Sequence, residues 1–521
     1  MEWWSCGSAA TENSSVQEGE CPWSMLRNKY NENMSSPIVA PSVASDRYRV
    51  ARQMSSVLLI LSFFLYFSWS RLAVHFAADD VMNLGRYFGL GPWRALANQA
   101  LLWRNAYRPM GAAFYLPMFY LFGLNPKPYQ AAIMVLLAIN TYLVYRVSRS
   151  LRCSKLVSGL TALVTCYHPG LSNLQYDIDM IYDVLCFGFY FSALAYYLRI
   201  RERQLDLTVW RMGGLLVLYV CALNSKEMAV SFPVVLLAYE VLYGDPPRHR
   251  LLRWICTGPR RVSLFTGVLT LMYIYGRTVG PNALAKHPAY HPVFSAGRLV
   301  AFQIGSLDDI LFFTWAVGWI GALAAWVCFT CLAWRCDRPV LRFAWLFALV
   351  TPLPIEFLEG RFQGCLYIPM VAWALLASTV LVEFANAANR VLLLILPRLN
   401  RPITKNVVLC GVVMVAVLLW ARETAFLHSV SIVPAGRQEG LLTWETVQQL
   451  KDLNPHVRRG SEIVVLDDPF TFYDMAFIIE LWFRDRTLSV HLQRLNPQPP
   501  EQIAKADHIF KFEEGRLRQL R

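Results

Sequence analysis

Two adjacent carboxylates, Asp79 and Asp80, follow the long apolar run 55–76 and are the side chains in this sequence best placed to do chemistry. A charged residue at bilayer depth costs several kcal/mol, so an acidic pair at the mouth of a membrane helix needs a reason. One reason is capping, because an Asp that begins a helix over 81–88 accepts backbone N–H bonds. The other is general-base chemistry on a hydroxyl group. Both interpretations stay open on these two residues alone.

The elements that must position this pair belong to a membrane protein. The chain has 521 residues, of which 55% are hydrophobic and only 16% are charged. Many apolar stretches approach the roughly 20 residues that cross a bilayer. The formal net charge is +13, yet residues 423–521 hold 12 Lys and Arg against 14 Asp and Glu. The basic excess therefore lies in the membrane half, where it signals topology, and no nucleic-acid partner is expected.

Basic clusters after alternate apolar runs set the topology and the domain boundaries. We expect an all-α polytopic membrane protein with about 11 transmembrane helices and a small C-terminal soluble α/β domain. Residues 1–46 lack the features of a signal peptide and are expected to form a disordered cytoplasmic arm. The membrane domain is 47–422, with large outer loops at about 77–127 and 276–309. The domain 423–521 is expected outside the cytoplasm, with helices over 441–453 and 472–483 and strands over 462–466 and 509–512.

With this topology, the polar residues that are unusual for a membrane protein converge on the outer face. They are Asp79 and Asp80, Tyr107 and Arg108, Asp177 and Asp183, Lys226 and Glu227, and Glu359 and Arg361. Ionisable residues gathered on one side of a membrane indicate a site for a charged substrate.

Several motifs in order carry a resemblance to a known family. After Asp79 and Asp80 come "YRP" at 107–109, "YLFGLNPKPYQ" at 120–130, "NSKEMAVSFPVVLLAYE" at 224–240 and "GRFQGCLYIP" at 360–369. Over about 50–385 this pattern resembles the GT-C glycosyltransferases, and within them the bacterial branch of the protein O-mannosyltransferases and the TPR-bearing O-mannosyltransferases. The chain departs from the pattern at 176–179, where Tyr-Asp-Ile-Asp replaces an Arg-containing "RxD", and at 360–369, where relatives have "ERYLYLP". No TPR repeats follow the membrane part.

The resemblance implies an inverting, mannosyltransferase-like hexosyltransferase of the bacterial inner membrane. Such an enzyme moves a sugar from a polyprenyl-phosphate carrier to a protein hydroxyl, lipid or glycan outside the cytoplasm. The basic clusters separately place the N-terminus inside and the C-terminus outside. The lipid-linked sugar is the donor, and the residues require no other cofactor. The site residues implied are Asp79 as base with Asp80 in support, Lys226 and Arg361 at the carrier phosphate, and Arg108, Tyr107, Asp177 and Glu227 at the substrate.

Plainer interpretations compete with these assignments. Lys226 and Arg361 also suit simple anchoring at lipid headgroups, or ion pairs with Glu227 and Glu359. His287 and His291 have i, i+4 spacing, but the prolines that follow each of them favour a loop over a metal site. Asp467 and Asp468 are expected in a turn. For the whole chain, the alternatives are a secondary transporter, which predicts inverted repeats and midplane charges, and a non-catalytic membrane scaffold.

Overall fold

The computed structural model describes residues 43–100, 107–244, 251–279, 286, 290–311, 318–395 and 402–521. Residues 1–57 and 58–521 form two units, and each is described by itself. The predicted N-terminal arm lies outside the described residues as far as residue 42. Its last four positions, 43–46, belong to helix α2 (Val43–Ser68).

Six helical segments in the described ranges are long and apolar enough to cross a membrane. They are Ser55–Ala73, Pro126–Ser150, Ile181–Glu202, Gly318–Arg335, Gln363–Leu392 and Val407–Leu453. They contain α2 with the 3-10 turn η1 (Trp69–Ala73), α6 (Pro126–Ser150), α8 (Ile181–Glu202), α14 (Gly318–Arg335), α16 (Tyr367–Ile395) and α17 (Pro402–Leu427). A multi-pass helical architecture is thus confirmed.

Five shorter helices stand where the sequence predicted further crossings. They are α7 (Lys155–Cys166), α9 (Val209–Ser225), α10 (Phe232–Tyr243), α12 (Val262–Thr278) and α15 (Pro339–Val350). Each is shorter than the roughly 20 residues of an upright crossing. The count of about eleven crossings therefore stays a prediction.

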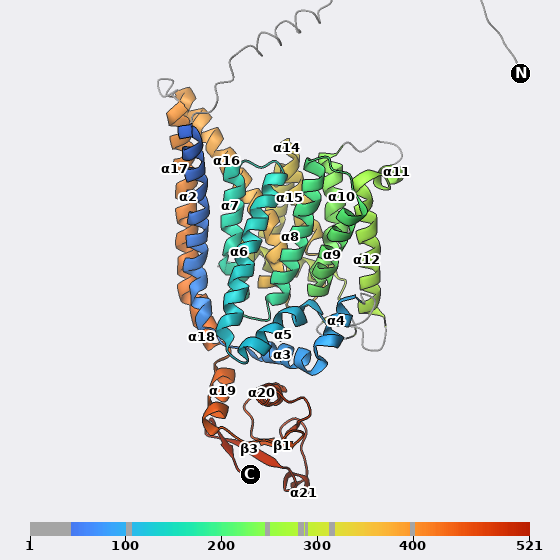
Figure 1. Ribbon diagram of the computed structural model, residues 1–521. Helices are drawn as coiled ribbons and strands as arrows, with labels where there is room; N and C mark the ends of the chain where they lie inside the picture. Colours follow the sequence, from blue (N-terminus) through green and yellow to red (C-terminus); the bar gives the residue numbers. More distant parts are fainter. Residues whose placement is uncertain are drawn as a thin grey trace, which may run out of the picture. The chain divides into compact units, whose positions relative to one another are not determined.

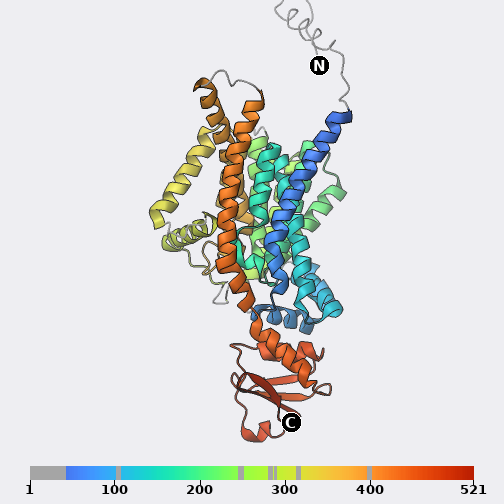
Figure 2. The ribbon, with the colours of Figure 1, turned by 90° about the vertical axis from the view of Figure 1, so that its left-hand side faces the viewer.

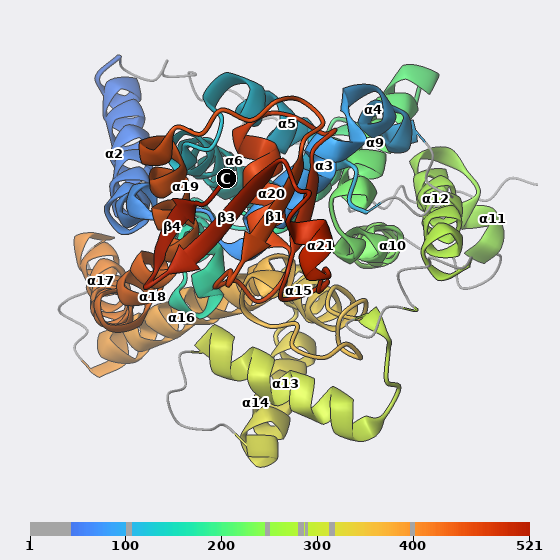
Figure 3. The ribbon, with the colours of Figure 1, turned by 90° about the horizontal axis from the view of Figure 1, so that it is seen from below.

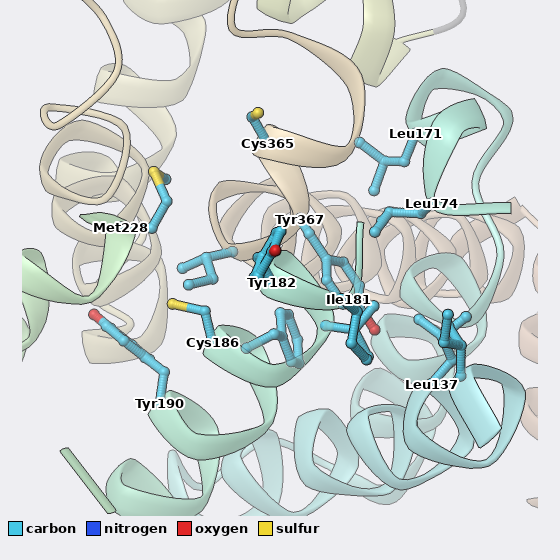
Figure 4. Packing of buried hydrophobic residues seen from close by; sticks show 14 of the residues in the cluster. Leu137, Leu171, Leu174, Ile181, Tyr182, Cys186, Tyr190, Met228, Cys365 and Tyr367 are labelled. Carbon is cyan, nitrogen blue, oxygen red and sulfur yellow. The ribbon is translucent and has the colours of Figure 1, made fainter. Parts of the chain in front are cut away.

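Helix α8 lies at the centre of the bundle and packs against α6 and α9 (Figure 1). It is apolar on every side, which is typical of a helix surrounded by other helices. The ring of Phe187 stacks on Phe191 at 4.2 Å and on Tyr367 of α16 at 3.9 Å between centroids. Figure 4 shows the buried side chains of α8 from Ile181 to Tyr190 gathered around Tyr367. This core fixes the start of α8, which carries Asp183.

The expected outer loop 77–127 contains three helices among its described residues. Helices α3 (Ala78–Leu90), α4 (Pro92–Ala100) and α5 (Met110–Phe122) pack on one another at one end of the bundle (Figure 1). Short 3-10 segments also occur between the long helices: η2 (Pro169–Gln175), η3 (Glu227–Ser231) and η7 (Gln363–Leu366). Helix α13 (Ala296–Leu311) packs against η2 and η7.

The C-terminal α/β domain follows α17 through a π-helical segment η9 (His428–Ile432), α18 (Val433–Gln438) and α19 (Leu441–Leu453) (Figure 2). Its sheet has the order β2-β1-β3-β4, with β1 parallel to both neighbours and β4 antiparallel to β3. In register, Ile463 stands opposite Val490 and His508. The elements are β1 (Glu462–Leu466), α20 (Asp474–Trp482), β2 (Ser489–Leu492), α21 (Pro500–Ile503), β3 (His508–Glu513) and β4 (Arg516–Gln519).

The four predicted elements of this domain are confirmed, and two of the strands were missed. β2 and β4 have only four residues each and lie at the two edges of the sheet. Edge strands are often short and polar, so they lack the buried apolar run that marks β1. Seen from the sheet side, α20 lies between the strands and α3, against which it packs (Figure 3).

Candidate active site

Asp79 and Asp80 occupy the first turn of α3 and have different environments. Asp80 is fully buried, and its Oδ2 accepts a hydrogen bond from the Ala77 backbone N–H at 2.8 Å. This bond ties the helix to the residue before it, as a cap does. Asp79 is exposed at the same end of α3. Capping therefore describes Asp80, while Asp79 presents its carboxylate to solvent.

A second pair of carboxylates, Asp177 and Asp179, lies beside the first. Burial, and next the charge of Asp179, raise the pKa of Asp177 to about 8. Burial, and next the charge of Asp79, raise the pKa of Asp179 to about 7. The backbone amide of Asp179 also approaches the carboxylate of Asp80. Carboxylates that lie close to one another ionise less readily, which is consistent with the raised pKa of both Asp177 and Asp179.

Asp179 was not among the predicted site residues. The signal was present in the departure from "RxD" at 176–179, where two acids stand two positions apart. A buried arginine from another element holds this segment in place. The Arg71 guanidinium donates to the carbonyl oxygens of Leu174 and Asp177, the latter at 2.9 Å. Arg71 is 0% exposed, so it acts from inside the protein.

Lys226 is buried and paired. Its Nζ lies 2.5 Å from Asp183 Oδ2 and 3.3 Å from Cys365 Sγ, and Lys226 is 2% exposed. Anchoring at lipid headgroups needs an exposed ammonium group, so that alternative is wrong for Lys226. The alternative pair with Glu227 is also wrong, because the lysine sits on Asp183 of α8.

Arg108 pairs with Glu227. Its Nη2 lies 3.2 Å from Glu227 Oε1 and 3.2 Å from the Tyr290 hydroxyl, and its guanidinium covers the ring of Tyr107 at 5.0 Å. Burial would raise the pKa of Glu227, but the charges of Arg108 and Lys226 outweigh it and lower that pKa to about 2.

The backbone of Arg108 is in the left-handed region, with φ of 38°. That conformation costs energy for a residue with a side chain. The hydroxyl of Tyr87 donates to the Arg108 carbonyl at 2.9 Å and so holds it there. The surrounding structure therefore fixes where this guanidinium points.

Arg361 lies next to this ionic group. Its guanidinium covers the ring of Tyr290 at 4.5 Å, the same tyrosine that Arg108 contacts. The turn after Arg361 is fastened by side chains of other elements: the Gln363 N–H donates to Asp309 Oδ2 at 2.9 Å and the Gly364 N–H to Asn173 Oδ1 at 2.7 Å. Glu359, the partner suggested for Arg361, pairs with Arg298 at 3.4 Å.

The acidic and the basic groups are close enough to act on one another. Asp179 is influenced by Asp79 on one side and by the charges of Lys226 and Arg108 on the other. The predicted site residues are thus linked by contacts and by electrostatic interactions, and Arg361 joins them through Tyr290. An exposed carboxylate beside buried, oriented cations suits a reaction in which a proton is accepted and negative charge develops on a leaving group.

A cavity and the arrangement of possible metal ligands bear on what else this part of the molecule could bind. A cavity of about 300 Å³ is lined by residues that include Gly170, Tyr176, Asp309 and Ile432, and by none of the predicted site residues. Tyr176 is the neighbour of Asp177, so the cavity adjoins the acidic group. Within the described ranges, no three His, Cys, Asp or Glu side chains are arranged to hold a metal ion. His287 lies outside those ranges.

Comparison with known proteins gives a likeness of fold. No protein-family model matches the chain, and no curated protein matches it. The chain is similar in fold to ArnT. The solved structure is that of ArnT from Cupriavidus metallidurans bound to undecaprenyl phosphate. The TM-score is 0.49 at 14% identity, over 88% of this chain and 97% of that one. This is a likeness in the course of the chain, and the roles of residues here are argued from their own contacts.

Proposed function

We propose that this protein is an inverting glycosyltransferase that moves a sugar from a polyprenyl-phosphate carrier to an acceptor hydroxyl. The observation that carries the proposal is an exposed carboxylate, Asp79, that shares an acidic group with Asp179, which in turn lies within electrostatic range of Lys226 and Arg108. The motif order, which resembles that of the GT-C glycosyltransferases, supports the same reaction. We place the site on the extracytoplasmic face of a bacterial inner membrane, in line with the predicted topology.

In the proposed reaction, Asp79 takes the proton of the acceptor hydroxyl. The hydroxyl oxygen then forms a bond to the anomeric carbon on the face opposite the phosphate. The bond from that carbon to the phosphate oxygen breaks, and its electron pair leaves with the polyprenyl phosphate. The general base removes a proton as the bond forms, so no positive charge accumulates on the acceptor oxygen.

The leaving phosphate gains negative charge, and we assign its direct contact to Arg361, while Lys226, which is buried on Asp183, contributes only its positive charge to the site. An arginine offers planar, bidentate contact to phosphate oxygens, and a lysine offers a compact charge. Arg108, Tyr107 and Glu227 are the proposed walls of this subsite.

The supporting acids have different proposed roles. Asp80 holds the start of α3, so that Asp79 faces the acceptor. Asp177 and Asp179 surround Asp79 and tune the proton balance of the group. The resemblance to O-mannosyltransferases makes mannose the first donor sugar to test, with a protein, lipid or glycan as the acceptor.

The experiment measures turnover of a synthetic polyprenyl-phosphate mannose by the purified full chain in nanodiscs. We expect release of polyprenyl phosphate, by transfer or by slow hydrolysis, and loss of that release in Arg361→Ala. The matched control is Arg338→Ala, because Arg338 is an exposed arginine paired with Glu383 at 3.0 Å, with 61% of its side chain accessible. A secondary transporter or a scaffold would leave the lipid-linked sugar intact, and that result would refute the proposal.

A further inference from the structure

The C-terminal domain contacts the segment that carries Asp79 in three places. Gly440, with φ of +70°, lies so near the backbone of Phe76 that a Cβ would stand 2.3 Å from the Phe76 carbonyl oxygen. The rings of His75 and Trp444 stack at 4.7 Å with an interplanar angle of 12°. In addition, α20 packs on α3, where a Cβ at Gly85 would meet the Phe477 ring at 2.5 Å. The C-terminal domain therefore packs against α3 and against the residues just before it, next to Asp79.

These contacts bring two further carboxylates toward Asp79. Glu439, one residue before Gly440, lies within electrostatic range of Asp79. Asp474, in the first turn of α20, is buried, and its pKa is raised by that burial first and also by the charge of Asp79. Asp79 thus faces acidic groups of the C-terminal domain as well as Asp177 and Asp179. Asp79 and those of its acidic neighbours that are ionised repel an anionic ligand at close range, so this mouth disfavours a phosphorylated or carboxylated acceptor.

The loop between β1 and α20 presents two aromatic side chains beside this acidic mouth. Phe472 is 67% exposed and Tyr473 is 57% exposed, although both directly precede the buried Asp474. Exposed aromatic side chains that adjoin one another commonly mark a binding surface. The loop also follows the carboxyl end of a central strand flanked by two parallel neighbours, which is where open α/β sheets bind ligands.

This loop is held in a defined conformation. Arg494 donates to the carbonyl oxygens of Thr471 and Phe472, at 2.9 Å each. Asp468 Oδ1 accepts from the Phe470 N–H at 3.1 Å. The other oxygen, Oδ2, is buried and accepts no hydrogen bond from any residue that the structure describes. A preorganised loop loses little conformational entropy when a ligand binds.

We propose that the loop 467–474 is the acceptor-binding element and that the acceptor is an uncharged glycan. This inference rests on the proposed function. The apolar face of a sugar ring packs on aromatic side chains such as Phe472 and Tyr473, while its hydroxyls donate to carboxylates. Aromatic side chains and carboxylates both occur within the loop 467–474. In this proposal, a sugar ring of the glycan stacks on Phe472 and Tyr473, and a hydroxyl of the neighbouring sugar then points toward Asp79.

The test uses the full chain in nanodiscs with polyprenyl-phosphate mannose and mannotetraose as the acceptor. A variant that combines Phe472→Ala with Tyr473→Ala is compared with Trp210→Ala, because Trp210 is 89% exposed on α9 and far in sequence from the loop. We expect the double variant to raise the KM for mannotetraose about tenfold or more and to leave the rate of donor hydrolysis and the donor KM unchanged. Trp210→Ala should match the wild type in all three.

A second readout follows binding without turnover. Saturation-transfer NMR with mannotetraose should give a signal for the wild type that the double variant loses, and a mannotetraose with a terminal phosphate should give none. The proposal is overturned if the double variant binds and uses mannotetraose as the wild type does. Transfer to a serine-rich peptide with none to mannotetraose would also overturn it. If the wild type does not consume the donor at all, the proposed function itself fails.

Discussion

The buried pair of Lys226 and Asp183 makes a quantitative prediction about Lys226→Ala. Their side chains are 3% and 4% accessible, and the two charged atoms are 2.5 Å apart. Removing the ammonium group leaves a carboxylate buried without its counter-charge, and such a loss costs about 3–5 kcal/mol. The sequence predicts Lys226 among the polar residues of the outer face, where the loss of an exposed charge would cost little stability. The structure requires a large loss of stability instead.

The assay is denaturant-induced unfolding of the detergent-solubilised protein, compared with two further variants. Arg338→Ala breaks an exposed pair and should change the free energy of unfolding by less than about 1 kcal/mol. The double variant Lys226→Met with Asp183→Leu removes both charges and should regain most of the stability, since apolar pairs often replace buried ion pairs at little cost. It should not regain turnover. Wild-type stability in Lys226→Ala would refute the argument from burial.

Three further predictions follow from the acidic group and the domain contact. Asp80→Asn should keep most of the turnover, because its amide oxygen still accepts a hydrogen bond from the Ala77 N–H. Asp80→Ala should lose about 1 kcal/mol of stability and much of the turnover. Thermal melting and donor release measure the two effects. The carboxyl group of Asp177 stays protonated in the folded protein up to its pKa of about 8, but it ionises near pH 4 in the unfolded chain. The free energy of unfolding should therefore fall as the pH rises between these two values. In Asp177→Asn the dependence of the free energy of unfolding on pH should be flatter. Gly440→Ala should lower the free energy of unfolding by about 1–3 kcal/mol and lower turnover, because the new Cβ would meet the Phe76 carbonyl and the φ of residue 440 is positive. A melting temperature equal to that of the wild type would show that the C-terminal domain packs loosely on the Phe76 segment.

Periodicity and charge were enough to predict most of the fold. Apolar runs of near-membrane length gave helices at the expected positions, and alternation predicted β1 and β3, because both signals are local. The spacing 441–453 predicted α19 with the bounds that the structure has. The number of crossings could not be settled in this way, because five of the apolar helices are shorter than a bilayer is thick.

The partners within the site could not be read from the sequence. Lys226 lies next to Glu227 in the chain, but the lysine ends α9 and reaches α8, whereas the glutamate begins η3 and meets Arg108. Which neighbour a side chain meets depends on helix packing, and packing is not local. Asp179 was missed for the same reason, since only the fold brings it beside Asp79. The different burial of Asp79 and Asp80, which share one turn, likewise required the position of α3.

The most direct test of the central claim is single-turnover transfer by Asp79→Asn with polyprenyl-phosphate mannose. Asn keeps the shape of the side chain but accepts no proton at neutral pH. Asp79 is exposed, so the variant should fold and bind the carrier as the wild type does. The account predicts carrier binding at wild-type strength with transfer and hydrolysis lost. Transfer at a near-normal rate would contradict it, because another group would then have to accept the proton of the acceptor hydroxyl.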